Sequence, residues 1–501
     1  MKTPFFVTTP IYYSNGIPHI GHSYSSLIAD VLARHRRMSG FDVKFSTGVD
    51  ENSQKVVEKA AEAGLETMAY ADLMAGKHRE VWDGIGISYT DFVRTTAPEH
   101  MKLVQEVLQK SFERGDIYEG EYEGMYCVGC EAFKKQADLT EAGKCPDHPN
   151  MNISHIKEKN WFFRLSKYEQ FLKDYYRDHP DFVIPLNRFA EVKEFVNGGL
   201  EDFSISRETN KFGIPLPFDP SQVTYVWYDA LFNYVSVCQG EDTRFWPADL
   251  HVVGKDIIRF HAIYWPAMLE SAGYAQPKNI LTTGHFTIDG QKISKSLGNV
   301  IEPVEFSAKY SRDMMLLYLL SAFPIGGDGD FSEKEAILAF NSKLANNIGN
   351  LLNRFIVLSL KIDGKVSGAL IPEIANTKSA FIERYSLAMD RYDLRDALAA
   401  AFDFGDVINK YVDTTKPWEM KDESQMKDLE NVLFQIGEAL RTIAIGLSPF
   451  FGEKMNELLA RVGAQTSSEL LKNGEMNKAF DLQTAFSVAE KGDPLYMRIP
   501  V

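Results

Sequence analysis

The sequence predicts an α/β protein in which a parallel-sheet domain is interrupted by an insertion and followed by a helical domain. The first fifty residues read as strand, helix and strand, whereas residues 118–224 concentrate cysteines, aromatic residues, Gly and Pro. After about residue 331, apolar residues recur at helical spacing. The 501 residues correspond to about two to four domains, at roughly 100–200 residues per domain.

Composition and charge narrow the class of protein. The hydrophobic fraction of 45% excludes a disordered chain. No apolar run approaches the roughly 18 residues of a membrane span, and the N-terminus lacks signal-peptide features, so a cytoplasmic protein is expected. The 54 basic and 69 acidic residues give a net charge of −15, which argues against DNA binding or any broad nucleic-acid surface.

The N-terminal unit predicts where a ligand binds. Phe5–Thr9 and Asp42–Thr47 are β-prone, and residues 22–38 between them carry apolar residues at helical spacing. Such a unit builds a parallel sheet, and ligands bind at the C-terminal ends of its strands. His19, His22 and Asp50 fall at those ends. Strand-like runs at 223–227, 251–253 and 280–282 continue the domain, and residues 343–360 and 396–412 read as helices.

Three cysteines and a histidine in the insertion have metal-ligand spacing. Cys127, Cys130, Cys145 and His148 form the pattern C-x2-C-x14-C-x2-H. Two such chelating pairs can surround a tetrahedral ion, and four protein ligands leave no position for water. We therefore predict one structural Zn²⁺; the alternative is a loop of thiols without metal. Cys238 lies far away in an aromatic stretch and is expected to be a buried apolar residue.

Two motifs suit phosphate chemistry. His19-Ile20-Gly21-His22 stands at a helix start, where the dipole favours anions and two imidazoles can donate hydrogen bonds. Residues 289–299, DGQKISKSLGN, place Lys292 and Lys295 in a Gly- and Ser-rich loop, where ammonium groups can neutralise a leaving pyrophosphate. Alone, the first motif is more often structural and the second more often a solvated loop. Together, in two halves of one domain, they are specific.

These residues resemble the two signatures of class I aminoacyl-tRNA synthetases. His19–His22 matches HIGH, and residues 292–296 match KMSKS with Ile293 in place of Met. The resemblance extends from residue 3 to about residue 500 and is to the methionyl-tRNA synthetase family. It is carried further by residues 11–16, 47–51, 225–234 and 254–257, by His261, and by the cysteine pattern within a short insertion.

The resemblance implies a Rossmann-type catalytic domain split by a connective insertion with a zinc knuckle, and an anticodon-binding helical bundle. The catalytic halves would be residues 1–117 and 225–290, with the insertion at 118–224. Residues 291–345 would hold the KMSKS loop and contact the tRNA stem, and residues 346–501 would form the bundle.

The resemblance also implies roles for individual residues. ATP would be bound by Tyr13, His19, Gly21, His22, Asp256, Lys292 and Lys295. His19, His22, Lys292 and Lys295 would act in catalysis, with Arg207 as a family arginine near the site. Methionine would be bound by Ile11, Tyr13, Asp50, Trp227, Leu231, Tyr234 and His261. Aromatic edges suit a thioether, and a carboxylate suits the substrate ammonium. Without the pattern, Trp227 and Tyr234 would read as ordinary core residues.

The tRNA end follows from the same resemblance. Asn350, Arg354 and Trp418 match anticodon-reading positions; the first two lie four residues apart, on one helical face. Amide and guanidinium groups can bind base edges, and an indole can stack on an unpaired base. Alternatively, Trp418, which follows a proline, has only the structural role of a residue at a helix start. Residues 343–361 carry three basic residues and no acid, which suits a confined RNA contact in an acidic protein.

The function implied is methionine–tRNA ligation, which supplies translation initiation and elongation. Methionine and ATP, with Mg²⁺, would give methionyl-adenylate and pyrophosphate, and methionine would pass to the 3′-terminal adenosine of tRNA(Met). The chain ends without the family's further dimerising domain, so a monomer is expected. Alternatives are a class I synthetase for another amino acid, an adenylyltransferase, or a non-catalytic tRNA-binding paralogue. Intact signature residues argue against the last.

Overall fold

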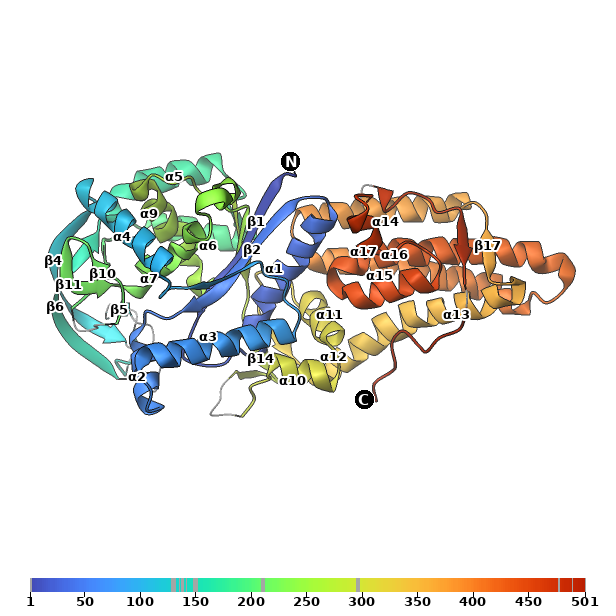
Figure 1. The fold of residues 1–501 in the computed structure, drawn as a ribbon, viewed down its shortest axis with the longest axis horizontal. Helices are drawn as coiled ribbons and strands as arrows, with labels where there is room; N and C mark the ends of the chain where they lie inside the picture. Colours follow the sequence, from blue (N-terminus) through green and yellow to red (C-terminus); the bar gives the residue numbers. More distant parts are fainter. Residues whose placement is uncertain are drawn as a thin grey trace.

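An α/β part and an all-helical part lie end to end along an elongated molecule (Figure 1). The computed structural model describes residues 2–127, 132–134, 136, 139–140, 142–146, 152–208, 212–293, 298–475, 478–488 and 490–500. Within these ranges, no helix is long and apolar enough to cross a membrane.

A six-stranded sheet forms the centre of the α/β part, in the order β3-β2-β1-β12-β13-β7 with every neighbouring pair parallel. The strands are β1 (Pro4–Tyr13), β2 (Asp42–Asp50), β3 (Asp91–Arg94), β7 (Val183–Ile184), β12 (Leu250–Gly254) and β13 (Asn279–Thr283). The parallel sheet predicted from the first fifty residues is confirmed. Edge strand β7, however, comes from the range expected to form the insertion.

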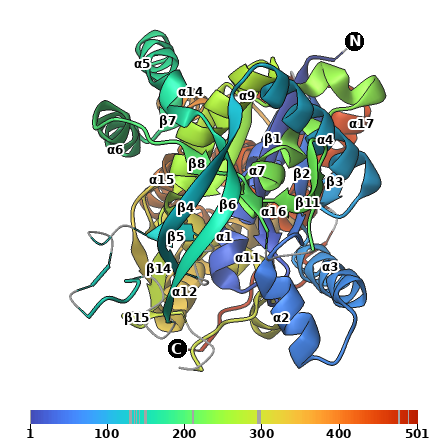
Figure 2. The same ribbon diagram turned by 90° about the vertical axis from the view of Figure 1, so that its left-hand side faces the viewer.

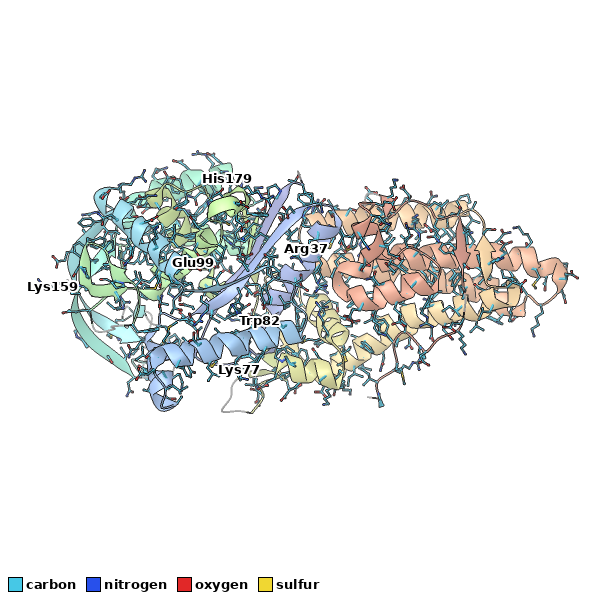
Figure 3. All side chains as sticks on the ribbon, viewed as in Figure 1. Arg37, Lys77, Trp82, Glu99, Lys159 and His179 are labelled. Carbon is cyan, nitrogen blue, oxygen red and sulfur yellow. The ribbon has the colours of Figure 1, made fainter. Side chains whose placement is uncertain are left out.

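Helix α1 (Ile20–Met38) connects β1 to β2, as its apolar spacing predicts, and Leu27, Ile28, Val31 and Leu32 are buried. Its basic C-terminal residues do more than complement the helix dipole. Arg34 pairs with Asp30 at 2.8 Å. Arg37, which is labelled in Figure 3, donates to the Ser88 hydroxyl at 2.5 Å. The other helices around the sheet are α2 (Gln54–Glu62), α3 (Thr67–Gly84), α4 (Pro98–Glu113), α8 (Asn233–Ser236) and α9 (Trp265–Ala272).

The insertion is built on a long antiparallel pair, β4 (Ile117–Cys127) and β6 (Ile153–Phe163), which lie side by side in Figure 2. With β5 (Ala132–Lys134) and β8 (Phe203–Ser204) they make a four-stranded sheet. A second sheet contains β9 (Ser206–Arg207), β10 (Pro215–Leu216) and β11 (Asp219–Thr224). Helices α5 (Glu169–Asp178) and α6 (Leu186–Asn197) complete the insertion.

The strand predicted at 223–227 is wrong in its second half. Strand β11 ends at Thr224 and belongs to the small antiparallel sheet, and helix α7 (Val226–Leu231) follows. A short run of β-branched and aromatic residues is ambiguous between strand and buried helix. Burial of Tyr228 and Leu231 in one cluster with residues of the insertion and α9 settles it as a helix.

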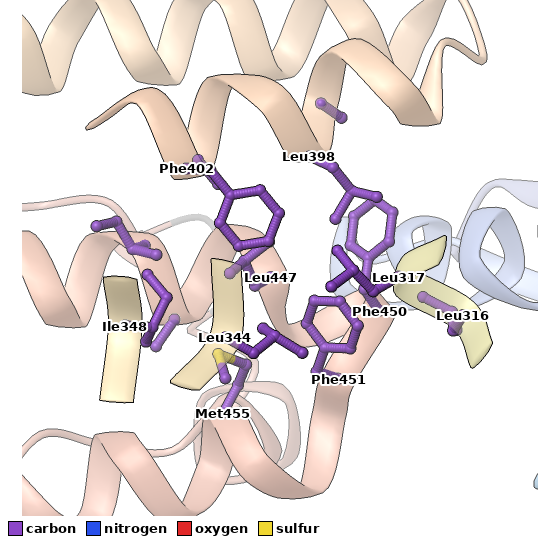
Figure 4. Close-up of a cluster of buried hydrophobic side chains, with 14 of the residues drawn as sticks. Leu316, Leu317, Leu344, Ile348, Leu398, Phe402, Leu447, Phe450, Phe451 and Met455 are labelled. Carbon is purple, nitrogen blue, oxygen red and sulfur yellow. The ribbon is translucent and has the colours of Figure 1, made fainter. Parts of the chain in front are cut away.

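Between sheet and helical part lie β14 (Phe286–Ile288), β15 (Gln291–Lys292) and β16 (Gly329–Phe331). The helices that follow are α10 (Pro303–Lys309), α11 (Arg312–Ala322), α12 (Glu333–Phe340), a π-helix (Asn341–Gly349), α13 (Asn350–Ser359), α14 (Pro372–Asp390), α15 (Leu394–Thr415), α16 (Met426–Arg461) and α17 (Ser467–Lys472). Strands β17 (Lys365–Ser367) and β18 (Ala485–Ser487) pair beside them. Figure 4 shows Leu344, Phe402 and Leu447 in their shared core.

The two parts share one continuous hydrophobic core, which runs from the sheet into the helical bundle. Arg312 ties them with polar contacts: its guanidinium binds Asp30 on α1 at 2.8 Å and the backbone oxygen of Phe450 on α16 at 3.0 Å. Phe451 leaves helical geometry just after Pro449, which kinks α16 at this contact. Helix α1 is thereby anchored to the helical bundle.

Candidate active site

A pocket of about 1060 Å³ opens at the C-terminal ends of the central strands. The two parts of the predicted site meet in this pocket. The histidines of the HIGH motif lie on one side, and the aromatic residues of α7 and α8 lie on the other. The predicted site residues lining it are Ile11, Tyr13, His19, Gly21, His22, Asp50, Trp227, Leu231, Tyr234, Asp256 and His261. Residues spread over 250 positions of sequence thus form one cavity, as expected where parallel strands end.

His19 and His22 cap helix α1 reciprocally. The Nδ1 of His19 accepts the backbone N–H of Gly21, and the Nδ1 of His22 accepts that of His19, each at 3.1 Å. The ring centroids lie 4.0 Å apart. Because each Nδ1 accepts a proton donor, a neutral ring carries its own hydrogen on Nε2. The helix start therefore presents two oriented Nε2–H donors beside its positive dipole end.

Gly21 sits tightly against this pair. A Cβ at Gly21 would stand 2.8 Å from Cε1 of His19, so any side chain would displace the imidazole. Ile293 lies 3.4 Å from the same point and lines the pocket. Ile293 of the second motif thus lies close to the first motif, as expected if both motifs bind the same substrate.

The aromatic end of the pocket is uncharged. Trp227 stacks on Phe260 with centroids 3.9 Å apart and planes 3° apart. The Tyr234 hydroxyl donates to Nε2 of His261 at 2.8 Å, while Nδ1–H of His261 donates to the backbone oxygen of Ile257 at 2.9 Å. Burial lowers the pKa of His261 to about 4, so the ring is neutral near pH 7.

Two residues of the aromatic end, Phe260 and His251, belong to none of the sequence motifs. Phe260 and His261 occupy a π-helix (Phe260–Tyr264), which turns neighbouring side chains toward Trp227. His251 lies behind the pocket, its ring 4.2 Å from that of Tyr234, and burial lowers its pKa far below the usual value. The only sequence signal for His251 is its place in a predicted strand of the sheet.

Asp50 is the carboxylate at the end of β2. It is 4% exposed and lines the pocket. Its backbone oxygen accepts the N–H and the hydroxyl of Ser14 at 3.1 and 2.9 Å. Ser14 follows β1, so these bonds tie together the ends of β1 and β2. Neighbouring Glu51 points elsewhere, to Arg94 at 2.9 Å.

Asp256 lies across the pocket in a 3₁₀ turn (Lys255–Ile257) that follows β12. Its carboxylate accepts Nε2–H of His285 at 3.0 Å. Partial desolvation by the surrounding pocket wall tends to raise the pKa of Asp256, but the hydrogen bond and charge of His285 outweigh it, so the pKa lies below its ordinary value. His285 also lines the pocket, and the sequence motifs did not indicate it.

The other predicted catalytic residues are placed differently. Arg207, on β9, is not among the residues lining the pocket; it donates to Ser204 Oγ at 3.0 Å, and its guanidinium lies over the Tyr225 ring. The backbone of Lys292 pairs with Thr287 of β14. The side chain of Lys292 and all of Lys295 lie outside the described residues.

The predicted zinc ligands fall partly outside the described residues. Cys130 and His148 are among those not described, whereas Cys127 and Cys145 are both completely buried. Lys144 and Pro146 beside Cys145 are exposed, so burial is particular to the thiol. Among the described residues, no three metal-binding side chains gather. Two completely buried thiols fit two of the four ligands of a tetrahedral site.

Two of the three predicted anticodon residues meet on the helical bundle. The Arg354 guanidinium lies 5.8 Å from the centroid of Trp418, and each side chain is 38% exposed. Asn350 is exposed one helical turn before Arg354. Acidic residues of helix α15, which are distant in the sequence, lie beside this stretch. Asp413 pairs with Arg354 at 3.0 Å, and Asp406 pairs with Lys343 at 3.6 Å. The acid-free stretch is therefore partly neutralised.

Comparison with known proteins adds independent observations. Residues 5–152 and 150–356 match the family model described as tRNA synthetases class I (M). The chain is 41% identical to a methionine–tRNA ligase of Thermotoga maritima over 99% of this chain and 80% of that protein. It is also 41% identical to a Rickettsia conorii methionine–tRNA ligase, over 94% and 95% of the two chains.

Solved structures agree with the sequence matches. The fold superimposes on a Mycobacterium tuberculosis methionyl-tRNA synthetase in complex with methionyl-adenylate, with a TM-score of 0.93 and 34% identity. The match covers 99% of this chain and all of the other. The free form of the M. tuberculosis enzyme matches with a TM-score of 0.86.

Proposed function

The chain belongs to the methionine–tRNA ligase family of class I aminoacyl-tRNA synthetases, and from this premise we propose how its residues perform the reaction. It is an enzyme that activates L-methionine with ATP to methionyl-adenylate and transfers methionine to tRNA(Met). One observation supports the residue roles most strongly: the histidine pair, Asp50 and the aromatic end share a single cavity. Methionine-dependent exchange of pyrophosphate into ATP tests the first step, and charging of tRNA tests the second.

Methionine binds at the aromatic end of the pocket. Asp50 pairs with the substrate ammonium: it is a buried carboxylate at the end of β2 that lines the pocket, and hydrogen bonds between an ammonium and a carboxylate are strong. Trp227, Leu231, Tyr234 and His261 enclose the thioether, and each sulfur–aromatic contact contributes about 0.3–1.5 kcal/mol. The neutral state of His261 keeps a charge away from the apolar side chain.

ATP binds at the helix α1 end, where chemistry is mostly positioning and charge stabilisation. The methionine carboxylate attacks the α-phosphate in line and pyrophosphate leaves, so no protein nucleophile is needed. His19 and His22 donate their Nε2–H groups to the phosphates, and Lys292 and Lys295 neutralise the leaving pyrophosphate. Mg²⁺ accompanies ATP and screens its phosphate charges. In the second step a hydroxyl of the terminal adenosine attacks the adenylate carbonyl and AMP leaves.

The Arg354–Trp418 pair on the helical bundle binds the anticodon. Trp418→Ala is expected to lower kcat/KM for tRNA charging by about 5- to 100-fold, because one base–aromatic stack is worth roughly 1–3 kcal/mol. The rate of methionine-dependent pyrophosphate exchange should not change, since Trp418 lies on the bundle and not among the pocket residues. Trp418→Phe, which keeps a stacking ring, is the matched control. Equal loss in both assays would show that Trp418 only supports folding.

Cys127, Cys130, Cys145 and His148 hold one structural Zn²⁺ in the insertion. When bound, the ion cross-links the segment and supplies no chemistry to the reaction. Metal analysis of the purified protein should find about one zinc per chain, and Cys127→Ser or Cys145→Ser should lower that number. Cys238→Ser, at a buried cysteine in a different cluster, should leave the zinc content unchanged. Zinc-free protein with full stability would contradict the site.

The regions take the roles of the family. Residues 1–117 and 225–290 catalyse adenylate formation, residues 118–224 form the connective insertion, and residues 291–345 hold the KMSKS loop and contact the tRNA stem. Residues 346–501 bind the anticodon. Because charged tRNA is consumed by ribosomes, we place the enzyme in the cytoplasm.

A further inference from the structure

His285 stands in the wall of the active-site pocket, on the segment between β13 and β14, and has no role in the mechanism above. We propose that His285 is a positioning residue that holds the carboxylate of Asp256 in the orientation that receives the ribose hydroxyls of ATP. The proposal rests on the proposed function, in which Asp256 binds the ribose. It gives that carboxylate a fixed partner within the protein.

Geometry carries the first step. Nε2 of His285 lies 3.0 Å from Oδ1 of Asp256. The same oxygen is folded back over Gly254: a Cβ added there would stand only 2.4 Å from it. Gly254 therefore makes room for one carboxylate oxygen, and the imidazole holds that oxygen through the hydrogen bond. An ionised carboxylate accepts up to about four hydrogen bonds, so ribose hydroxyls can bind while His285 stays in place.

The backbone of His285 is held as firmly as its ring. Its N–H donates to Oδ1 of Asp328 at 2.9 Å, and Oδ2 of Asp328 pairs with Nζ of Lys255 at 2.5 Å. Lys255 immediately precedes Asp256. The segments that follow β12 and β13 and the one that precedes β16 are thus linked in a closed ring of contacts, so the Asp256–His285 distance depends on three segments.

Exposure argues that this pair serves a ligand. The side chains of His285 and Asp256 are 54% and 60% exposed, because the pair faces the open pocket. Exposed pairs of this kind add little to the stability of a fold. Both side chains nevertheless meet at the rim of a pocket that must receive a nucleotide. Removing His285 should therefore leave the fold intact. The carboxylate of Asp256 would then be mobile, and the nucleotide would have to order it on binding.

Two substitutions separate the hydrogen bond from the ring. His285→Gln keeps an N–H donor and loses the ring, whereas His285→Phe keeps a ring and loses the donor. In methionine-dependent pyrophosphate exchange, His285→Phe and His285→Ala should raise KM for ATP about 5- to 20-fold, the scale of a charge-assisted hydrogen bond. KM for methionine should stay within about twofold, and His285→Gln should stay within about threefold of the wild type for both substrates.

Deoxynucleotides locate the effect. If His285 acts by orienting Asp256 toward the ribose, the increase in nucleotide KM caused by His285→Ala should be smaller with a deoxynucleotide that lacks the hydroxyl bound by Asp256. With that analogue, either 2′-deoxy-ATP or 3′-deoxy-ATP, the increase should stay within about twofold. An equal penalty with ATP and both analogues would overturn the proposal. Activity restored by Phe but not by Gln would assign the ring to stacking on the base and also overturn it. Wild-type protein without methionine-dependent exchange would instead refute the proposed function itself.

Discussion

Replacing His19 with asparagine or His22 with glutamine is expected to slow methionyl-adenylate formation by about 100- to 1000-fold, the cost of removing one preorganised transition-state donor. KM for methionine should change little, because neither imidazole belongs to the aromatic end of the pocket. Single-turnover formation of the adenylate, measured by rapid quench, reports this step directly.

The two substitutions are chosen because both histidines also cap helix α1. Asparagine is a good N-cap residue, and glutamine three positions later can return the reciprocal bond of a capping box. Each variant thus keeps the cap and removes the imidazole Nε2–H; the amide NH2 that remains is attached to the same carbon as the capping oxygen and no longer occupies the position of Nε2. The thermal midpoint should move by less than about 3 °C, whereas His19→Ala, which loses the cap, should cost roughly 1 kcal/mol of stability. A capped variant with full activity would remove that histidine from the mechanism.

Asp50→Asn should raise KM for methionine by at least about 100-fold, because removing one partner of a buried charge pair costs roughly 3–5 kcal/mol. KM for ATP should stay within about threefold, since the ammonium belongs to methionine alone. The measurement is pyrophosphate exchange at varied methionine and at varied ATP.

Glu51 provides the matched control for Asp50. It is the next carboxylate in the chain, fully buried, but it pairs with Arg94 and does not line the pocket. Glu51→Gln should lower the thermal midpoint and leave KM for methionine unchanged. A methionine analogue without its amino group should bind wild type and Asp50→Asn with similar weak affinity. Loss of affinity for this analogue in Asp50→Asn would show that Asp50 does not bind the ammonium.

Local pattern and motif residues predict the frame of the molecule. The β1-α1-β2 unit follows from two β-prone runs around a helical period, and it fixes where His19, His22 and Asp50 meet. The helices at 343–360 and 396–412 follow equally from apolar spacing, although the first is part π-helix and part α-helix. Periodicity reports which face is buried and does not report the hydrogen-bond register within a turn.

What the sequence could not predict depends on contacts between distant segments. The segment that starts at Val226 is a helix only because the insertion and α9 cover the face that carries Tyr228 and Leu231. Strand β7 lies within the insertion but joins the central sheet. It has only two residues, too few to show a sequence pattern. His285 meets Asp256 only because parallel strands β12 and β13 end side by side.

The charge of the tRNA-binding face illustrates the same limit. Residues 343–361 contain three basic residues and no acid. In the folded protein Asp406 and Asp413 of α15 pair with Lys343 and Arg354. The two acids of α15 therefore offset two of the three positive charges of that stretch. RNA must compete with these acids, which favours a contact that depends on the shape and bases of the tRNA over general attraction to phosphate.

The central claim is that one pocket selects methionine and activates it with ATP. Its most direct test is exchange of labelled pyrophosphate into ATP, run with the purified protein and each of the twenty amino acids in turn. We expect methionine to support exchange and the other nineteen to give a rate at least about 100-fold lower, the discrimination that roughly 3 kcal/mol of pocket contacts provides. Exchange driven by another amino acid, with methionine inactive, would contradict the account.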